Sequence, residues 1–239
     1  MSLPARPAYT IYRWLWTGFD WLYPPECGGC GQVGLRWCAE CQAATQNISS
    51  PFCRTCGATG VNRDELSNRC LAYPPNFSAL RSWTLFAGPV RNAIHRLKYQ
   101  RDIALGEVLA RPLIQMVVEE DWDIDLIVPV PLSVARKIER GYNQAALLAR
   151  PIALATGWSY QPRAMQRTKE TRSQVGLTLK ERYSNVSGAF LANRKKVSGK
   201  HVLLIDDVTT SGATLEACSQ ALRTAGALEV YCLTIARVV

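Results

Sequence analysis

The sequence predicts an α/β fold with a mainly parallel sheet flanked by helices, preceded by a small cysteine-rich module. From residue 76 onward, short apolar runs typical of buried strands alternate with amphipathic helical segments. Before that point, seven of the nine cysteines lie between Cys27 and Cys70. With 239 residues, of which 48% are apolar, the chain can form one α/β domain and an accessory module.

Three segments follow from these patterns. Residues 1–23 carry aromatic side chains at helical spacing, which predicts a short helix that packs on its own protein, with a membrane-surface helix as the alternative. Residues 24–75 form the cysteine module, and a Pro-Pro pair marks its end. Residues 76–239 form the α/β domain.

Positive charge is concentrated in the second half of the chain. The chain holds 28 Lys and Arg against 19 Asp and Glu, and residues 136–200 alone hold 14 bases and 3 acids. Such a segment favours an anionic partner, and polyphosphate and nucleic acid both fit this charge. A solvated basic face is the plain alternative.

Nothing in the sequence indicates a membrane segment or a secretory signal. No charge-free stretch approaches the roughly 20 apolar residues that a membrane-spanning helix needs. The N-terminus lacks a basic start followed by an apolar run and a small-residue cleavage site. We therefore expect a cytoplasmic protein without a membrane span.

The cysteines form three C-x-x-C pairs, and such pairs are typical of zinc ligands because two sulfurs three residues apart can grip one metal from a tight turn. A first set can close a tetrahedral zinc site by itself: Cys27, Cys30, Cys38 and Cys41. A second set has only three sulfurs: Cys53, Cys56 and Cys70. Ser67 stands where a fourth pair would place its first cysteine, so this second site is empty, weak or completed by another ligand. No internal repeat is evident.

The α/β domain is expected to contain four strands and four main helices. The strands are predicted over 79–86, 124–130, 201–205 and 229–238. The helices are predicted over 88–99, 103–119, 142–156 and 212–225. Pro151 is expected to kink the third of these helices.

The stretch VLLIDDVTTSGAT at 202–214 is the most informative. Four apolar residues predict a buried strand, which places Asp206 and Asp207 at its carboxyl end, where α/β proteins bind ligands. The backbone N–H groups of the following loop would point into one concavity at a helix N-terminus and bind phosphate. Adjacent carboxylates suit the two hydroxyls of a ribose. The candidate ribose ligands are Asp206 and Asp207, and the candidate 5-phosphate ligands are Thr210, Ser211, Gly212, Ala213 and Thr214.

This stretch resembles the phosphoribosyl pyrophosphate (PRPP) motif of type I phosphoribosyltransferases. Further segments narrow the resemblance to the ComF family of competence proteins, which includes GntX-like members: HRLKY at 95–99, VPVPL at 128–132, RGYNQ at 140–144 and RTKETRSQVGLTLKERYSNVSGAF at 167–190. The paired cysteines are similar to the zinc-ribbon module of that family. The resemblance implies a type I phosphoribosyltransferase fold, and Ser67 departs from members with four complete cysteine pairs.

The resemblance also implies roles for the basic segment. The pyrophosphate of PRPP would be held by a loop and the helix after it, with the candidates Leu132, Ser133, Arg136, Lys137 and Arg140. A mobile loop over 166–178 would close over the ligand. Its candidate phosphate contacts are Arg167, Lys169, Arg172 and Gln174, with solvated loop charge as the alternative.

The implied function is a PRPP-binding protein that acts in DNA uptake during natural transformation, with structural Zn²⁺ in the cysteine module and Mg²⁺ accompanying PRPP. The alternative is an active phosphoribosyltransferase that transfers ribose 5-phosphate to an unknown nitrogen nucleophile and has no direct role with DNA. The fold does not establish turnover, and catalytic residues are unassigned. Single-stranded DNA and DNA-translocation machinery are the further implied partners. Trp37 and Phe52 could stack on such a strand, with core packing as the alternative.

Overall fold

The computed structural model describes residues 6–61, 65–169 and 178–238. The strands are β1 (Ala79–Leu85), β2 (Leu126–Pro129), β3 (Ser159–Tyr160), β4 (Met165–Arg167), β5 (Phe190–Ala192), β6 (His201–Thr209) and β7 (Glu229–Arg237). The helices are α1 (Pro7–Leu22), α2 (Ala39–Ala43), α3 (Asn68–Ala72), α4 (Gly88–Tyr99), α5 (Leu105–Glu119), α6 (Val134–Arg140), α7 (Gln144–Thr156), α8 (Leu179–Val186), α9 (Arg194–Val197) and α10 (Ala213–Thr224).

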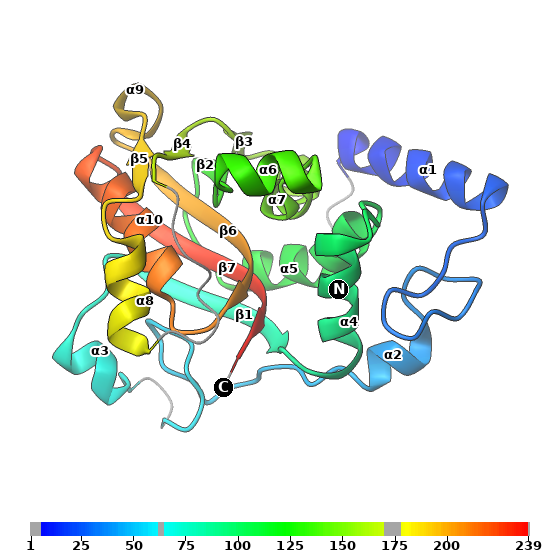
Figure 1. Cartoon of the computed structure of the whole chain (residues 1–239), viewed down its shortest axis with the longest axis horizontal. Helices are drawn as coiled ribbons and strands as arrows, with labels where there is room; N and C mark the ends of the chain where they lie inside the picture. The colour runs from blue at the N-terminus through cyan, green and yellow to red at the C-terminus, as the bar shows by residue number, and fades with distance from the viewer. Residues whose placement is uncertain (1–5, 62–64, 170–177, 239) are drawn as a thin grey trace.

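Five strands form one parallel sheet in the order β1-β7-β6-β2-β3 (Figure 1). Side chains alternate between its two faces, as the twofold period of a strand requires. In β6, Leu203 and Ile205 join the apolar cluster that contains residues of α4, α5 and α7. Val202 and Leu204 join a second apolar cluster, which contains residues of α10 and of the antiparallel pair β4–β5. The sheet is therefore covered on both faces, and the predicted parallel α/β fold is confirmed.

Each strand and helix predicted for the α/β domain is present, with one correction at β6. This strand does not end at Ile205, because its pairing with β7 continues to the pair Thr209 and Arg237. Helix α7 runs on through Pro151. Helices α6, α8 and α9 and the short strands were not predicted, because these elements are too short to show a clear apolar period.

Helix α1 confirms the predicted N-terminal helix and packs on the α/β domain through Tyr9 and Tyr12, which contact the first apolar cluster. Tyr9 is 2% exposed and its hydroxyl donates to Oε1 of Glu107 on α5 at 3.3 Å. Trp14 and Trp21 are 72% and 91% exposed. Among the described residues, no helix has the length and apolar character that crossing a membrane requires.

The segment between the two cysteine groups adds to the outer edge of β1. The Ile48 amide donates to the Trp83 carbonyl at 2.9 Å. The Leu85 amide donates to the Gln46 carbonyl at 3.0 Å. An open sheet edge presents unpaired backbone groups, so this segment, residues 46–48, acts as a cover for the edge.

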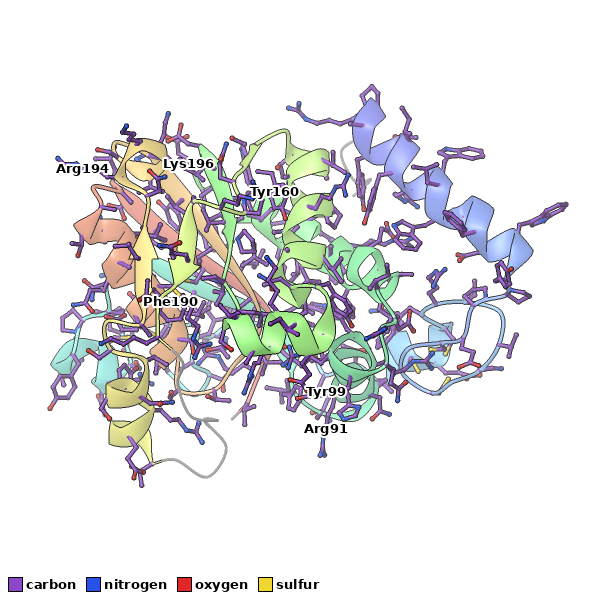
Figure 2. The ribbon with its side chains drawn as sticks, turned by 45° about the horizontal axis from the view of Figure 1, so that its top comes forward. Arg91, Tyr99, Tyr160, Phe190, Arg194 and Lys196 are labelled. Atoms are coloured by element: carbon purple, nitrogen blue, oxygen red, sulfur yellow. The ribbon has the colours of Figure 1, made fainter. Side chains whose placement is uncertain are left out.

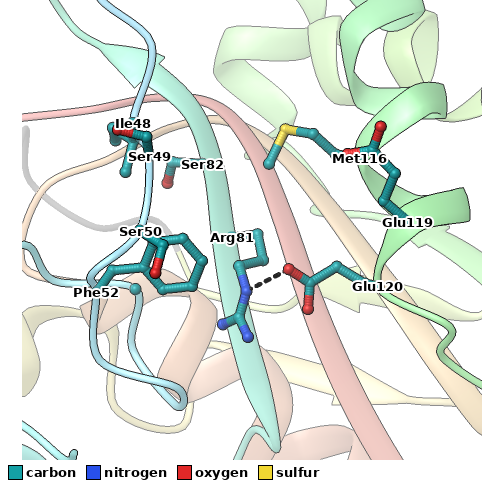
Figure 3. A pocket seen from close by; sticks show the side chains of 10 residues that line it. Ile48, Ser49, Ser50, Phe52, Arg81, Ser82, Met116, Glu119 and Glu120 are labelled. Atoms are coloured by element: carbon teal, nitrogen blue, oxygen red, sulfur yellow. Dashed lines mark hydrogen bonds and ion pairs between the residues drawn. The ribbon is translucent and has the colours of Figure 1, made fainter. Parts of the chain in front are cut away.

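Phe52 lies just beyond this cover and packs against Arg81 of β1 (Figure 3). The Arg81 guanidinium lies 4.8 Å from the centre of the Phe52 ring, and its Nε donates to Oε1 of Glu120 at 2.6 Å. Trp37 packs against the first apolar cluster and donates from Nε1 to Oε1 of Gln42 at 3.0 Å. Both rings are partly buried and make contacts within the protein, and stacking on DNA stays a prediction.

The two halves of the cysteine module lie on opposite sides of the α/β domain, with α2 and α3 far apart in Figure 1. In the first half, the Gly29 carbonyl accepts from Nδ2 of Asn92 on α4 at 2.8 Å. In the second half, the Cys56 carbonyl accepts from Arg237 at the end of β7. The domain boundaries given above stay predictions, and each half is seated on the sheet domain.

The seating of the second half can be tested at Gly57. Gly57 has a φ of +66°, and a Cβ there would lie 2.5 Å from the Leu80 carbonyl oxygen, whereas Gly60 has a φ of +80° and open space around its Cβ position. Alanine at either position carries left-handed strain of about 1–2 kcal/mol. We expect Gly57→Ala to lower the free energy of unfolding in urea by at least about 1 kcal/mol more than Gly60→Ala. Equal losses would contradict the contact with β1.

Candidate functional site

The sheet opens where β6 parts from β2. The Val130 amide donates to the Ile205 carbonyl at 2.9 Å, and the pairing of these two strands ends there. Strand β6 continues beside β7 to Thr209, so its other edge has no strand neighbour among the described residues from Asp206 onward. This opening lies at the carboxyl end of the sheet, where α/β proteins bind ligands.

Asp207 is buried at this opening and is held by residues of two helices. It is 3% exposed and forms an ion pair with Lys98 of α4. Gln144 of α7 donates from Nε2 to Oδ1 of Asp207 at 3.1 Å. Arg140 donates to Oε1 of Gln144 at 2.8 Å and lies 5.2 Å from the centre of the Tyr99 ring, which Figure 2 labels on α4.

The two carboxyl groups differ in their electrostatics. Burial raises the pKa of Asp207, but the Lys98 ammonium and the hydrogen bonds from Lys98, Gln144 and Asp206 together hold that pKa below its usual value. Asp206 is partly exposed, and desolvation together with the charge of Asp207 holds its pKa well above the usual value. Asp207 is therefore the fixed carboxylate of the pair, and Asp206 is the acid that a ligand at the opening can reach.

The 210–214 loop links β6 to α10 and turns at Gly212, whose φ is +77°. The Ser211 hydroxyl accepts from the Ala213 amide at 3.4 Å. The Ser211 carbonyl accepts from the Tyr183 hydroxyl of α8 at 3.1 Å and from Arg69 of the cysteine module at 2.6 Å. The loop is thus fixed by contacts from two other parts of the chain.

Thr209 lies beneath this loop with an unused hydroxyl. Its side chain is 3% exposed, and its Oγ1 has no hydrogen-bond partner among the described residues. Oγ1 lies 4.0 Å from the position that a Cβ on Gly212 would occupy. A buried hydroxyl without a partner costs free energy, so this atom fits a site that a hydrogen-bonding ligand completes.

The candidate pyrophosphate residues have different surroundings. Ser133 is 5% exposed and caps α6, since its Oγ accepts from the Arg136 amide at 3.4 Å. Leu132 is partly buried, and Arg136 and Lys137 are exposed on α6. Arg140, 6% exposed, is already bonded to Gln144. The exposed pair on α6 is therefore freer to meet an anion than Arg140 is.

The candidates for the mobile loop are only partly described. Arg167 belongs to strand β4 rather than to a loop, and its guanidinium lies 5.5 Å from the centre of the Phe190 ring on β5, which Figure 2 labels. Lys169 is exposed. Arg172 and Gln174 lie outside the described residues.

The first cysteine set forms a compact cluster, as the sequence predicts. The four Sγ atoms of Cys27, Cys30, Cys38 and Cys41 all lie within 4.8 Å of one another. The Cys27–Cys41 and Cys30–Cys38 sulfurs are 3.5 Å and 3.8 Å apart, too far for disulfides and close to the separation of about 3.8 Å in a tetrahedral zinc site with bonds of about 2.3 Å. Burial raises the pKa of Cys27, but backbone N–H donors lower it overall to about 6. The donor set fits structural zinc.

The second set also gathers its sulfurs, and it repeats the first half. The Sγ atoms of Cys53, Cys56 and Cys70 lie within 4.8 Å of one another. Each half contains a C-x-x-C turn that is closed by a backbone hydrogen bond. An isolated β-bridge flanks each turn, between Glu26 and Val33 in the first half and between Phe52 and Thr59 in the second half. The expectation of no internal repeat is therefore wrong. We call the two cysteine sets the first and second clusters.

Comparison with protein families agrees with this architecture. Residues 18–71 match the double zinc ribbon domain, and residues 105–238 match the phosphoribosyl transferase domain. The fold and the site thus define a phosphoribosyltransferase-domain protein that carries a double zinc ribbon.

Relatives narrow this class further. The chain is 32% identical to "DNA utilization protein YhgH" of Escherichia coli (strain K12), over 82% of this chain and 88% of that protein. It is 31% identical to "Competence protein F" of Haemophilus influenzae, over 84% and 90% of the two chains. It is 26% identical to "Competence protein ComFC" of Streptococcus pneumoniae, over 84% and 87%. The chain belongs to the ComF family.

A solved structure of an adenine phosphoribosyltransferase covers 60% of this chain and 75% of that chain, with 20% identity and a TM-score of 0.37. This likeness is too distant to locate a site.

Three residues around the opening were not assigned by sequence reasoning. Lys98 and Gln144 lie in the HRLKY and RGYNQ segments, which carried the family resemblance but no stated role. No local sequence pattern marks Arg69 of the cysteine module as part of the site, because its contact with the Ser211 carbonyl spans 142 residues of sequence. Only the folded chain brings these side chains to the 206–214 region.

The Lys98–Asp207 pair can be tested by its effect on stability. Lys98→Met leaves a buried carboxylate unpaired, so we expect a loss of about 3 kcal/mol in the free energy of unfolding at pH 7. The pair's contribution is present above the unfolded pKa of Asp, about 3.9, and is lost as the pH falls through the lowered folded pKa. The difference between the two proteins should therefore shrink below about pH 4 in urea titrations.

The controls for this experiment are a second variant and an exposed pair. Lys98→Met combined with Asp207→Asn should recover at least half of the loss, since no buried charge is left. Lys200→Met removes the exposed partner of Asp125 and should cost less than about 1 kcal/mol. A loss of unfolding free energy in Lys98→Met that stays the same from pH 7 to pH 3 would contradict the ion pair between Lys98 and Asp207.

Proposed function

We propose that the opening at the end of β6 binds PRPP and that the protein uses this site in DNA uptake or utilization. The observation that carries the proposal is the unpaired buried hydroxyl of Thr209, beneath a left-handed glycine turn and two residues from a pair of acids. This arrangement suits a ribose 5-phosphate, in which an anionic phosphate and two hydroxyls lie on one small sugar.

Each part of the ligand has a counterpart in the chain. The 5-phosphate would be bound by the 210–214 loop and the hydroxyl of Thr209. The ribose hydroxyls would donate to Asp206 and Asp207, and the fixed carboxylate of Asp207 would orient the sugar. The pyrophosphate would lie toward the exposed bases of α6, and Arg167 and Lys169 would be further candidates for its contacts.

Mg²⁺ fits this scheme as the counter-ion of PRPP. It prefers oxygen ligands and keeps several waters, so the ligand's own oxygens would supply most of its shell. Asp206 is an acid at the opening that could supply one further oxygen. The protein itself supplies orientation of the ribose and cationic stabilisation of the pyrophosphate, the two contributions that matter in displacement at a ribose carbon.

The role with DNA is supported by the family and by the charge of the chain. Relatives over most of this chain are named for DNA utilization and for competence. The net charge of +9 suits a polyanion. A phosphoribosyltransferase without any role in DNA metabolism is not favoured by these relatives.

The ligand assignment predicts a division of labour between the acids and the loop. Asp206→Asn should weaken PRPP binding several-fold, because it replaces an acceptor of a ribose hydroxyl and a hydrogen bond is worth about 0.5–1.5 kcal/mol. Inorganic phosphate should still compete in this variant. Gly212→Val should lose both PRPP and phosphate, since a β-branched residue is strained at φ +77° and fills the phosphate position. Isothermal titration in Mg²⁺ measures both ligands.

Thr209→Val isolates the hydroxyl in the same titration. It should weaken PRPP and phosphate several-fold without lowering stability, because the hydroxyl has no protein partner to lose. Thr84→Val is the matched control: its hydroxyl donates to the Gln46 carbonyl at 2.6 Å, so stability should fall while PRPP binding stays unchanged. PRPP affinity as tight as the parent's in folded Asp206→Asn and Thr209→Val would refute the proposed site.

Binding of single-stranded DNA should depend steeply on salt. Lys and Arg that neutralise phosphates release counter-ions, so the affinity should fall by about tenfold or more between 50 and 200 mM salt. Filter binding with a labelled oligonucleotide measures this slope. An affinity for DNA that does not change with salt would exclude the basic segment, residues 136–200, as the binding surface.

A further inference from the structure

The second cluster repeats two hydrogen bonds of the first cluster, with a serine in place of one cysteine. In the first half, Cys38 caps α2 by accepting from the Cys41 amide at 3.4 Å, and its own amide donates to Sγ of Cys27 at 3.4 Å. In the second half, Ser67 caps α3 by accepting from the Cys70 amide at 3.3 Å, and its amide donates to Sγ of Cys53 at 3.3 Å. Ser67 thus occupies the position of Cys38.

The hydroxyl of Ser67 stands at the fourth ligand position. Its Oγ lies 3.4 Å from Sγ of Cys56, beside the three sulfurs. A neutral hydroxyl is a much weaker zinc ligand than a thiolate, so a zinc ion here would be held by three strong ligands rather than four. Sites with three protein ligands keep their fourth position open to water or another donor.

This open position faces a cavity that also reaches the 210–214 loop. The cavity has a volume of about 1020 Å³, and its walls include Cys56, Ser67 and Cys70 together with Ser211 and Gly212. The second cluster and the candidate phosphate site therefore border the same space, which belongs partly to the cysteine module and partly to the α/β domain.

Arg69 connects the two sites directly. It lies next to Cys70 in α3, and its guanidinium donates to the Ser211 carbonyl at 2.6 Å. The same guanidinium lies 5.4 Å from the centre of the Tyr183 ring, whose hydroxyl donates to the same carbonyl at 3.1 Å. Helix α3 is only one turn long, so a metal bound at its N-terminal end and at Cys70 would fix the base from which Arg69 reaches the loop.

We propose that the second cluster holds an exchangeable zinc whose fourth position, at Ser67, opens to this cavity, and that the occupied cluster holds Arg69 against the 210–214 loop. Zinc at this cluster then raises the affinity of the loop for its phosphorylated ligand. This inference has two halves: the metal half is the exchangeable zinc itself, and the coupling half is the effect of that zinc on ligand affinity. The coupling half rests on the proposed PRPP site. The metal half does not.

The metal half is tested by zinc release from the full chain. Elemental analysis of zinc-saturated protein should give two zinc per chain, and a chromogenic chelator should take one quickly and one slowly. Ser67→Cys supplies a fourth thiolate and should slow the rapid release at least about tenfold. Ser159→Cys, an exposed thiol on β3, is the matched control and should leave both rates unchanged.

X-ray absorption gives a second readout, the number of sulfurs bound to zinc, which does not depend on the rate of zinc release. The average zinc coordination should be near 3.5 sulfurs in the parent and near four in Ser67→Cys. One zinc per chain in both proteins, or a rapid release that Ser67→Cys does not slow, would overturn the metal half.

The coupling half is tested by calorimetric titration of PRPP with Mg²⁺, before and after removal of the rapidly released zinc. Removal should weaken PRPP binding about fivefold or more, and added zinc should restore it. Arg69→Met should keep two zinc, bind PRPP at the weakened level and no longer respond to zinc. Arg54→Met removes an exposed arginine of the same half and should behave like the parent.

The outcomes separate the two proposals. Equal PRPP affinity with one and two zinc, or a zinc response that persists in Arg69→Met, would overturn the coupling and leave the PRPP site standing. Absence of PRPP binding in the fully metallated parent would overturn the PRPP site and the coupling together, while the release rates and sulfur count still decide the metal half.

Discussion

The ion pair between Lys98 and Asp207 is the constraint around which the opening of the sheet is built. A carboxylate that is 3% exposed cannot remain charged without a partner, and Lys98 supplies it from helix α4. Gln144 brings helix α7 to the same carboxyl group. Strand β6 is thereby fixed to the helices on one face at the place where it leaves β2. The neighbouring acid, the glycine turn and the buried hydroxyl take their positions from this point.

The second half of the cysteine module contributes to the same region from the opposite face of the sheet, where Cys56 packs against the second apolar cluster. Its connecting segment covers the edge of β1, and its second half reaches the 210–214 loop through Arg69. Metal binding in such small segments supplies much of their folding free energy. The loop that faces the ligand is therefore supported partly by packing within the sheet domain and partly by a segment whose order depends on sulfur ligands.

The sequence was informative where a pattern is local. The β6 run predicted its strand, the acid pair and the glycine turn, and the C-x-x-C spacing predicted the first cluster. It was silent where partners are distant: the Gln144–Asp207 contact spans 63 residues, and nothing in either segment alone marks it. The repeat of the two cysteine halves was hidden for a local reason. Cys30 and Cys38 are 8 residues apart, whereas Cys56 and Ser67 are 11 apart, and a serine replaces the sulfur.

The place of β1 in the sheet has a consequence for how the chain folds as it is made. Its strand partner is β7, and the contact between the hydroxyls of Ser82 and Thr234 spans 152 residues. A ribosome must therefore synthesise almost the whole α/β domain before β1 gains that neighbour, and such distant pairing is slow. The 46–48 segment is synthesised before β1 and is available to pair with its other edge as soon as β1 emerges. During this interval it limits the strand's exposure to association with other nascent chains.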